Sequence, residues 1–439
     1  MHVLTRSTLA LAIVAASALA QASEQSEGQG LVADSHLNLL NRGLYYNDDN
    51  RASGAEQSRS EEAAYGALAT FESGFTQGTL GFGVDAHGMF GAKLDSGRGR
   101  AGSGLLPEDG GNCNGDGLCG SQDSYGEAGG ALKARLSNTT LKIGEMFVHT
   151  PVYDTGDTRL LPETSTGILL SSKEITDLEL TAGHFTAANR QSSTNSGDVF
   201  YGYGEGVESD GAMDLLGASY SFSEATSGSL FASELEDYWR QYYLNLSHEI
   251  SLADERSLRF KFDLYRTNEY GAAKAGEISN TFWSLASTYT TGPHALTLAY
   301  QEVDGNTPFD YVTNWGIYVA NSYYSDFNGP NEKSVKLQYD LDLGELVSPG
   351  LSAFAVYMKG FDIDGTQIAS DSAYYSDWSG MDDETHHELN LGAKYVVPSG
   401  PAKDLSFYLV QQVHRASSGQ YDGDHDRVRL YVEYPLEIF

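Results

Sequence analysis

Apolar and polar side chains alternate through the last thirteen residues of the chain, RVRLYVEYPLEIF, from Arg427 to Phe439. Because successive side chains of a β-strand point to opposite faces, this segment has one apolar face and one charged face. The apolar face holds Val428, Leu430, Val432, Tyr434 and Leu436. Such a strand suits a wall with lipid on one side and water on the other, and it also suits the closing strand of a soluble β-sandwich.

The same alternation recurs along the whole chain. About eighteen stretches show it, from His36–Asn47 to Arg427–Ile438, and they are bounded by turn residues. No stretch of comparable length carries an apolar stripe with a period of 3.6 residues. An even number of alternating stretches without helices predicts an all-β protein, a transmembrane antiparallel β-barrel of about 18 strands.

The connections between these stretches alternate in length. Short turns such as Leu252–Glu255 and Thr291–Pro293 alternate with long polar segments. The long segments are Gly97–Tyr125, Pro151–Thr166, Arg190–Gly211, Asp304–Lys333 and Asp362–Glu384. Periplasmic turns and longer extracellular loops are typical of outer-membrane barrels. A barrel of sixteen to eighteen strands encloses an aqueous lumen, so its function depends on the residues that line the lumen.

The N-terminus has the pattern of an export signal. A weakly basic start, Met1–Arg6, precedes the apolar run Leu9–Leu19, which is too short to cross a bilayer as a helix. Small residues follow, and cleavage after Ala20 or after Ala22 fits them equally well. We expect residues 1–22 to be a signal peptide and residues 23–439 to form a single transmembrane β-barrel porin domain in the bacterial outer membrane.

The composition agrees with this fold and excludes one class of partner. The 439 residues include 49 Gly and 28 Tyr, which suits a barrel with aromatic girdles. The formal net charge is −33, so we expect no binding to nucleic acid. The 27 Lys and Arg residues are therefore informative through their positions rather than their number.

Several cations occupy the polar face of the alternating stretches, where they would point into the lumen. The stretches place Lys133, Arg135, Arg259, Lys261, Arg427 and Arg429 there. In addition, Arg42 and Arg51 flank the segment YYNDDN, and Lys394 lies in LNLGAKYVV. Rows of lumenal cations can pass an anion from site to site. The alternative is that they are solvated wall residues without a role in selectivity.

The remaining motifs predict no chemistry. Cys113 and Cys119 lie in a Gly- and Asn-rich loop, where an oxidising compartment favours a disulfide between them. The acidic segments at Asp362 and Asp422 lack the ligand spacing of an EF-hand, and no zinc-protease or nucleophile-elbow motif is present. We therefore expect no metal, no cofactor and no enzymatic activity.

Longer segments resemble a known family. FESGFTQGTLGFGVDAHGMFGAKLDSG at Phe71–Gly97, PVYDTGDTRLLPETSTGILLSS at Pro151–Ser172, YQEVDGNTPFDY at Tyr300–Tyr311 and the closing VRLYVEYPL are similar to the OprD-type porins of pseudomonads. The resemblance covers nearly all of the chain after residue 22. It implies an eighteen-stranded barrel, monomeric or weakly trimeric, with inward-folded extracellular loops and a narrow pore. It also implies contact with outer-membrane lipid and lipopolysaccharide and delivery by the barrel-assembly machinery.

The resemblance further implies a ladder of basic residues that guides carboxylates. By position, Arg42, Arg51, Lys394, Arg427 and Arg429 resemble ladder members, and the set extends to Lys133 and Arg135. Arg159 in Pro151–Thr166 and Asp326 in Asp304–Lys333 resemble constriction-loop residues. The chain departs from the family at Tyr408 and Val410, where arginines are expected in the penultimate strand, and at the first turn, YYNDDN.

These observations predict a porin for selective passive diffusion of small carboxylate-bearing solutes, such as organic or aromatic acids, amino acids or peptides. Two other classes stay open at this point. An outer-membrane hydrolase needs a Ser/His pair at one height of the wall, for which His248 is the candidate histidine. A soluble secreted β-protein, such as a lectin or a lyase, needs no membrane at all. The sequence does not specify the solute, the pore radius or the oligomeric state.

Overall fold

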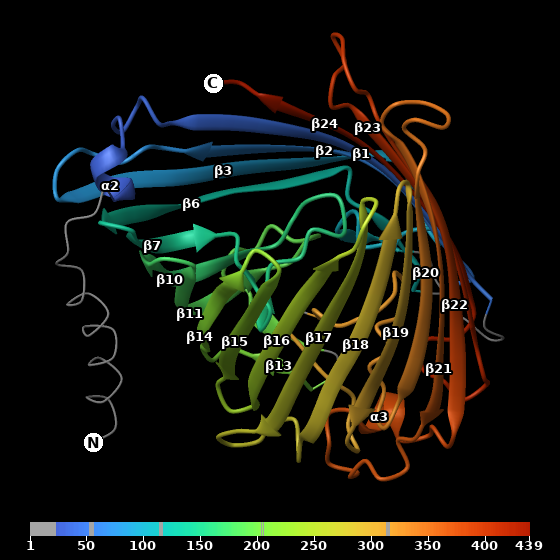
Figure 1. Ribbon diagram of the computed structural model, residues 1–439. Helices are drawn as coiled ribbons and strands as arrows, with labels where there is room; N and C mark the ends of the chain where they lie inside the picture. The colour runs from blue at the N-terminus through green and yellow to red at the C-terminus, as the bar shows by residue number, and fades with distance from the viewer. Residues whose placement is uncertain (1–22, 52–56, 114–116, 203, 205, 313–316) are drawn as a thin grey trace.

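The protein is a closed antiparallel β-barrel (Figure 1). The structure, a computed structural model, describes residues 23–51, 57–113, 117–202, 204, 206–312 and 317–439. The predicted signal peptide lies outside the described residues. Within the described chain, no helix has the length and hydropathy needed to cross a membrane.

One sheet of eighteen strands forms the wall. Its strands are β1 (His36–Asn50), β2 (Arg59–Glu72), β3 (Leu80–Asp95), β6 (Ser124–Leu136), β7 (Thr139–Met146), β10 (Thr164–Ile175), β11 (Leu178–Asn189), β14 (Met213–Ser223), β15 (Thr226–Leu235), β16 (Trp239–Ser251), β17 (Arg256–Glu269), β18 (Ser279–Thr291), β19 (His294–Asp304), β20 (Lys333–Asp342), β21 (Leu351–Ile363), β22 (Glu384–Val396), β23 (Ser406–Ala416) and β24 (His425–Glu437). The predicted strand number and fold class are confirmed.

Short elements lie in the connections between the wall strands and, in the case of α2, before the first of them. They are β4 (Glu108–Cys113), β5 (Cys119–Ser121), β8 (His149–Thr150), β9 (Tyr153–Asp154), β12 (Phe200–Tyr201), β13 (Glu208–Ser209), α2 (Glu24–Glu27) and α3 (Tyr375–Trp378). The long predicted loops all fall at one end of the barrel, here called the loop end. The connections at the other end, here called the turn end, are all short.

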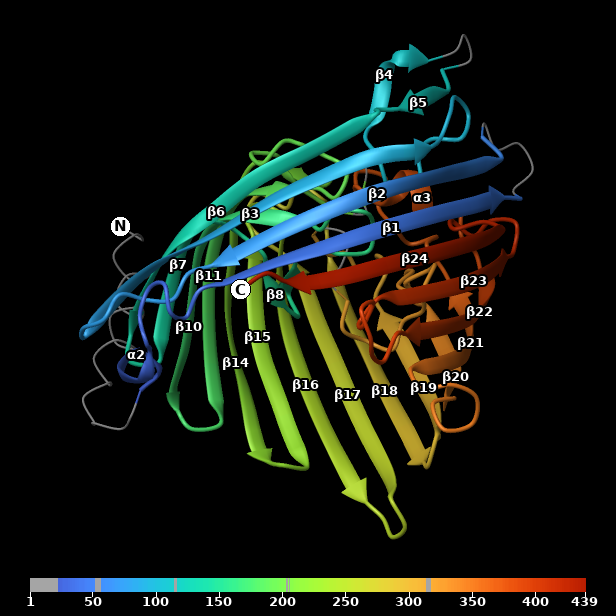
Figure 2. The same cartoon turned by 90° about the horizontal axis from the view of Figure 1, so that it is seen from above.

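The barrel closes where its first wall strand meets its last. β1 pairs antiparallel with β24 over nearly its whole length, and every other wall strand pairs with its neighbours along the chain. In this register Tyr46 lies opposite Arg429, and Asp48 lies opposite Arg427. Figure 2 shows β24 beside β1, with the wall continuous across the join.

The two faces of the wall have the predicted chemistry. On β6, Leu132 points outward and is 71% exposed, whereas its neighbour Lys133 is buried inside. On β17, Phe260 is exposed outside, whereas Tyr265 is buried inside. An apolar outer surface with polar and aromatic residues inside is the arrangement of a membrane barrel.

Loops fill part of the lumen. Wall residues Tyr265 and Phe282 pack against Phe309 of the loop after β19, with ring centroids 4.8 and 4.9 Å apart. Tyr153 of β9 packs in the same way on Phe185 of β11. The inward-folded loops therefore have an apolar core of their own, and they narrow the lumen at mid-height.

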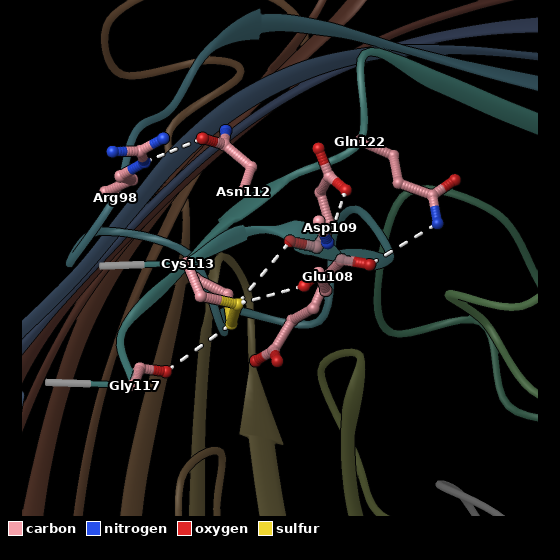
Figure 3. Close-up of a disulfide and its surroundings, with 10 residues drawn as sticks. Arg98, Glu108, Asp109, Asn112, Cys113, Gly117 and Gln122 are labelled. Atoms are coloured by element: carbon pink, nitrogen blue, oxygen red, sulfur yellow. Dashed lines mark hydrogen bonds between the residues drawn. A yellow bond between two sulfur atoms is a disulfide. The ribbon is translucent and has the colours of Figure 1, made fainter. Parts of the chain in front are cut away.

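The predicted cysteine pair lies away from this core. Cys113 and Cys119 form a disulfide between β4 and β5, so the segment expected to be a plain loop is a short hairpin. Figure 2 shows this hairpin projecting beyond the loop end of β3 and β6. In the close-up of Figure 3, Arg98 donates a hydrogen bond to Asn112 beside the disulfide (2.7 Å).

Candidate pore constriction

An arginine of the wall holds the loop between β7 and β10. Arg42 of β1 is only 6% exposed, and it donates two hydrogen bonds to the Asp157 carboxylate (2.5 and 3.0 Å). It also donates to the Arg159 carbonyl (3.0 Å) and to Glu433 of β24 (2.7 Å). Paired donors match the geometry of a carboxylate, so this contact fixes the orientation of the loop as well as its position.

A buried carboxylate of the wall holds the loop between β19 and β20. Glu388 of β22 accepts hydrogen bonds from three successive backbone N–H groups, those of Tyr323, Tyr324 and Ser325 (2.9–3.0 Å). The Ser322 hydroxyl donates to the same carboxylate (2.8 Å). The Asn390 amide of β22 also donates to this carboxylate (2.7 Å). Because the other four donors come from one short segment, Glu388 fixes the position of that segment and of its tyrosines.

The two loops also contact each other. The Tyr318 hydroxyl donates to Asp154 of β9 (2.6 Å), and burial together with this hydrogen bond raises the pKa of Tyr318 far above its usual range. Lys261 of β17 donates to the Tyr318 carbonyl (2.8 Å), and Lys336 of β20 donates to the Asn321 carbonyl (2.9 Å). The constriction is therefore a single connected unit between opposite parts of the wall.

Three guanidinium groups surround one tyrosine ring at the constriction. The centroid of Tyr46 lies 5.1 Å from Arg427, 5.3 Å from Arg429 and 5.4 Å from Arg159. Tyr46 belongs to β1, Arg427 and Arg429 belong to β24, and Arg159 belongs to the loop that Arg42 holds. The negative face of the ring compensates part of the repulsion between the cations.

The three arginines differ in their partners. Arg427 forms a salt bridge with Asp48 (2.6 Å). Among the described residues, neither Arg159 nor Arg429 pairs with a carboxylate, and Arg429 instead contacts the Tyr323 carbonyl (3.3 Å). Burial lowers the pKa of Arg159 below its usual range, and the neighbouring cations lower it further. These two guanidinium groups thus present positive charge that the protein itself leaves uncompensated.

Aromatic side chains continue from the arginines toward the turn end. Tyr431 packs against Tyr408 (centroids 5.7 Å apart), Tyr408 stacks on Phe354 (6.1 Å), and Phe354 stacks on Tyr323 (5.2 Å). We call these four residues the aromatic shelf. Lys394 lies opposite Tyr408 in the sheet, so a cation also flanks the shelf at its far end.

Comparison with known proteins agrees with this geometry. Residues 29–438 match the family model described as outer membrane porin, OprD family. The chain belongs to the OprD family of outer-membrane porins. It is 46% identical to Porin D of Pseudomonas aeruginosa over the full length of both chains. It is 28% identical to the porin-like protein GalP of Pseudomonas putida over 94% of this chain and 95% of that protein.

Solved structures of OprD-family porins share the architecture. A crystal structure of Pseudomonas aeruginosa OprD superposes with a TM-score of 0.82 at 45% identity, covering 96% of this chain and 100% of that chain. A structure of OpdK with vanillate, from the same organism, gives a TM-score of 0.81 at 32% identity, covering 93% and 100%. The protein is therefore a channel of the outer membrane, and its relatives are porins rather than enzymes.

The structure of this OprD-family porin separates the predicted ladder into groups. Arg427, Arg429 and Arg159 come together at the constriction, and Lys394 lies at the far end of the aromatic shelf. Arg42 is beside them, but its guanidinium is occupied by the loop and by Glu433. Arg42 therefore holds the loop in place, and its guanidinium is not free to contact a passing solute.

The other predicted cations lie apart from the constriction. Lys133 pairs with Asp85 (2.5 Å), and Arg135 hydrogen-bonds Gln25 of the N-terminal segment (3.0 Å). Arg259 forms a salt bridge with Glu249 near the turn end (2.6 Å). Lys261 faces the lumen, but it supports the loop as described above.

Arg51 does not point into the lumen, although its predicted place in the basic ladder requires it to do so. It pairs with Asp49 and Asp426, which alternate along their strands with the lumenal Asp48 and Arg427. Arg51 is thus on the outer side of the loop-end rim. β1 ends at Asn50, so Arg51 lies outside the strand. The number of residues between Arg42 and Arg51 therefore does not determine where the Arg51 side chain points.

Asp326 lies on the predicted constriction loop, where it accepts a hydrogen bond from Tyr311 (2.8 Å). Sequence reasoning missed Tyr46, Glu388 and Lys336. The sequence does indicate that Lys336 faces the lumen, because this residue lies between the outward Val335 and Leu337. Glu388 likewise alternates with the outward Leu389 and Leu391, but its contacts with a loop segment more than sixty residues away have no signal in the sequence.

Proposed function

We propose that this porin admits small carboxylate-bearing solutes by passive diffusion, with a preference for aromatic acids. The observation that carries the proposal is the pair of lumenal guanidinium groups, Arg159 and Arg429, that have no carboxylate partner in the described part of the chain. A carboxylate passing the constriction accepts charge-assisted hydrogen bonds from them. No energy input is needed, because selectivity follows from narrowness and lumenal charge.

The aromatic shelf supports the preference for a flat solute. Arg429 contacts the Tyr431 hydroxyl and the Tyr323 carbonyl of the shelf, so a solute held by its carboxylate can place its ring against the shelf. Offset or edge contacts between aromatic rings contribute about 0.5–1.5 kcal/mol beyond area burial. The OpdK structure with vanillate shows an aromatic carboxylate with a relative of the same architecture.

The test compares two solutes of similar size and equal charge. Benzoate has an aromatic face and cyclohexanecarboxylate has none. In liposome-swelling assays, we expect the purified protein to admit benzoate faster than cyclohexanecarboxylate. The double substitution Arg159→Gln/Arg429→Gln is expected to slow both anions several-fold while leaving small neutral sugars unaffected.

A matched control uses Arg240, which pairs with Glu234 on the outer face of the wall. Arg240→Gln removes one arginine from the outer face of the wall and leaves the lumen unchanged, so solute flux should not change. Unchanged anion flux in the double variant would contradict the role of the two arginines. Equal rates for the two acids would contradict only the aromatic preference.

A further inference from the structure

Three neighbouring wall strands bring a histidine and two glutamates together on the lumenal side. They are His87 of β3, Glu127 of β6 and Glu145 of β7, and one ligand atom from each lies within 4.8 Å of the other two. Imidazole nitrogen and carboxylate oxygen are ligands of divalent transition-metal ions. This cluster is distinct from the arginines of the constriction.

A glycine with an unusual backbone conformation completes the cluster. Lys142 of β7 faces the lumen, because it pairs with the buried Asp85. Simple alternation then turns Glu145, three residues later, outward. Gly144 has a φ of 138°, a region that favours glycine, and this irregularity brings the Glu145 side chain back to the lumenal side.

The cluster leaves buried polar atoms without partners. Both oxygens of Glu127 and Nε2 of His87 are buried and lack a hydrogen-bond partner among the described residues. His87 is 8% exposed, and its Nε2 lies 3.4 Å from Glu145, outside hydrogen-bond geometry. Of the three, Glu145 accepts a hydrogen bond, which the Thr164 hydroxyl donates (2.7 Å). Two buried carboxylates at this separation repel each other unless a cation or a proton lies between them.

The lack of a side chain at Gly129 lets the Glu145 carboxylate lie close to His87. Gly129 lies opposite His87 in the sheet, and a Cβ there would meet the Glu145 carboxylate and come within 2.7 Å of His87 Cε1. The Phe147 ring packs against His87 with centroids 5.2 Å apart and covers one side. Three potential ligand atoms within 4.8 Å of one another, with an aromatic ring on one side, suit a small ion.

We propose that His87, Glu127 and Glu145 bind one divalent transition-metal ion, for which Zn²⁺ is the probe. Imidazole disfavours Ca²⁺ and Mg²⁺, which take oxygen ligands. Three protein ligands leave a fourth tetrahedral position for water or for a solute carboxylate. The divalent ion neutralises the two carboxylates, so a negative site on the wall becomes a neutral one beside Thr164, where the constriction loop rejoins the barrel.

A second histidine cluster shows why this one is singled out. His386, His414 and Asp422 also lie close together. There, however, His386 contacts Glu332 (2.6 Å) and His414 (2.8 Å), and His414 contacts the Gly423 carbonyl (2.6 Å). The nitrogens that would bind a metal are already used, so that cluster is stabilised by its own hydrogen bonds.

The experiment titrates chelator-treated, detergent-purified, untagged porin with ZnCl₂ by calorimetry. We expect saturable binding of one ion per chain, and weakening by about 10-fold or more in Glu127→Gln and in His87→Gln. His184→Ala is the matched control, since within the described part of the chain His184 pairs with a single carboxylate, Asp214, and we expect this variant to retain binding. Heat-modifiable gel mobility verifies that each variant is folded.

Absence of saturable one-to-one binding by the native chain would overturn the proposal, and so would unchanged affinity in folded Glu127→Gln. In either case the two glutamates share a proton instead. If Glu127→Gln does not fold, His87→Gln gives the same decision. The measurement needs no solute flux, so it is independent of the proposed function.

Discussion

Arg42 and Asp157 join the barrel wall to the constriction loop through two hydrogen bonds between one guanidinium and one carboxylate. Arg42 is buried against β24 on its other side, where Glu433 accepts a third hydrogen bond. The loop therefore cannot leave the lumen without separating this pair. Since the same loop carries Arg159, the pair also decides whether three arginines meet around Tyr46.

We expect Arg42→Gln to widen the pore. The variant leaves Asp157 and Glu433 without their charged donor, which costs roughly 1–3 kcal/mol for each charged hydrogen bond lost. Single-channel conductance in planar bilayers should rise, and the apparent Tm in detergent should fall. Arg240→Gln, on the outer face, should change neither quantity. A native conductance in Arg42→Gln would show that the remaining contacts of the loop hold it without Arg42.

Glu388→Ala is expected to release the segment that carries Tyr323 and Tyr324. The substitution removes the acceptor of three backbone N–H groups, of which that of Ser325 is buried and those of Tyr323 and Tyr324 are partly buried. A buried group left unsatisfied costs about 1–3 kcal/mol. The aromatic shelf loses Tyr323 as a result, so benzoate should lose its advantage over cyclohexanecarboxylate in swelling assays. Retained discrimination would place the aromatic preference elsewhere in the lumen.

The fold was predictable because strand alternation is a local property. Val428 to Leu436 already define an outward face, and the register of β1 and β24 then places Arg427 and Arg429 inside. The lumenal position of Lys394 followed in the same way. No contact with a distant loop was needed for these assignments.

The site was less predictable, because it depends on loops that return to the wall. Arg42 was recognised as lumenal, but its engagement with Asp157 joins residues 115 positions apart. Glu145 was missed because Gly144 interrupts the alternation that sequence reasoning relied on. Fold-back contacts and single backbone irregularities leave no periodic signal in the sequence.

Reduction of the disulfide is expected to affect only the hairpin of β4 and β5. The bond between Cys113 and Cys119 closes a loop with a sequence separation of 6, which stabilises by about 2 kcal/mol in the loop-entropy description. Hydrogen exchange of the hairpin amides should accelerate after reduction with dithiothreitol. Conductance and heat-modifiable mobility should stay native, and a change in either would tie the hairpin to the pore.

The stability contributed by His149 should depend on pH. A hydrogen bond to Asp154 raises the pKa of His149 above its usual range, so the folded state favours the protonated imidazole. Its contribution is therefore fully present below the ordinary histidine pKa of about 6.5, and it is lost as the pH rises through the raised value. The difference in apparent Tm between the native chain and His149→Gln should be largest at acidic pH and should disappear at alkaline pH. A difference that grows with pH would contradict the assignment.

Tyr408→Arg tests whether the departure from the family ladder determines selectivity. The new guanidinium would lie between Lys394 and Tyr431 in the sheet, about 6.8 Å farther along the wall than the row of Arg429. Reversal potentials in a salt gradient should shift toward higher anion selectivity, because a lumenal cation has been added. Discrimination of benzoate from cyclohexanecarboxylate should fall, since the shelf has lost a ring. Tyr408→Phe keeps the ring and adds no charge, so both properties should stay native in that variant. An unchanged reversal potential in Tyr408→Arg would mean that solutes do not pass along the shelf.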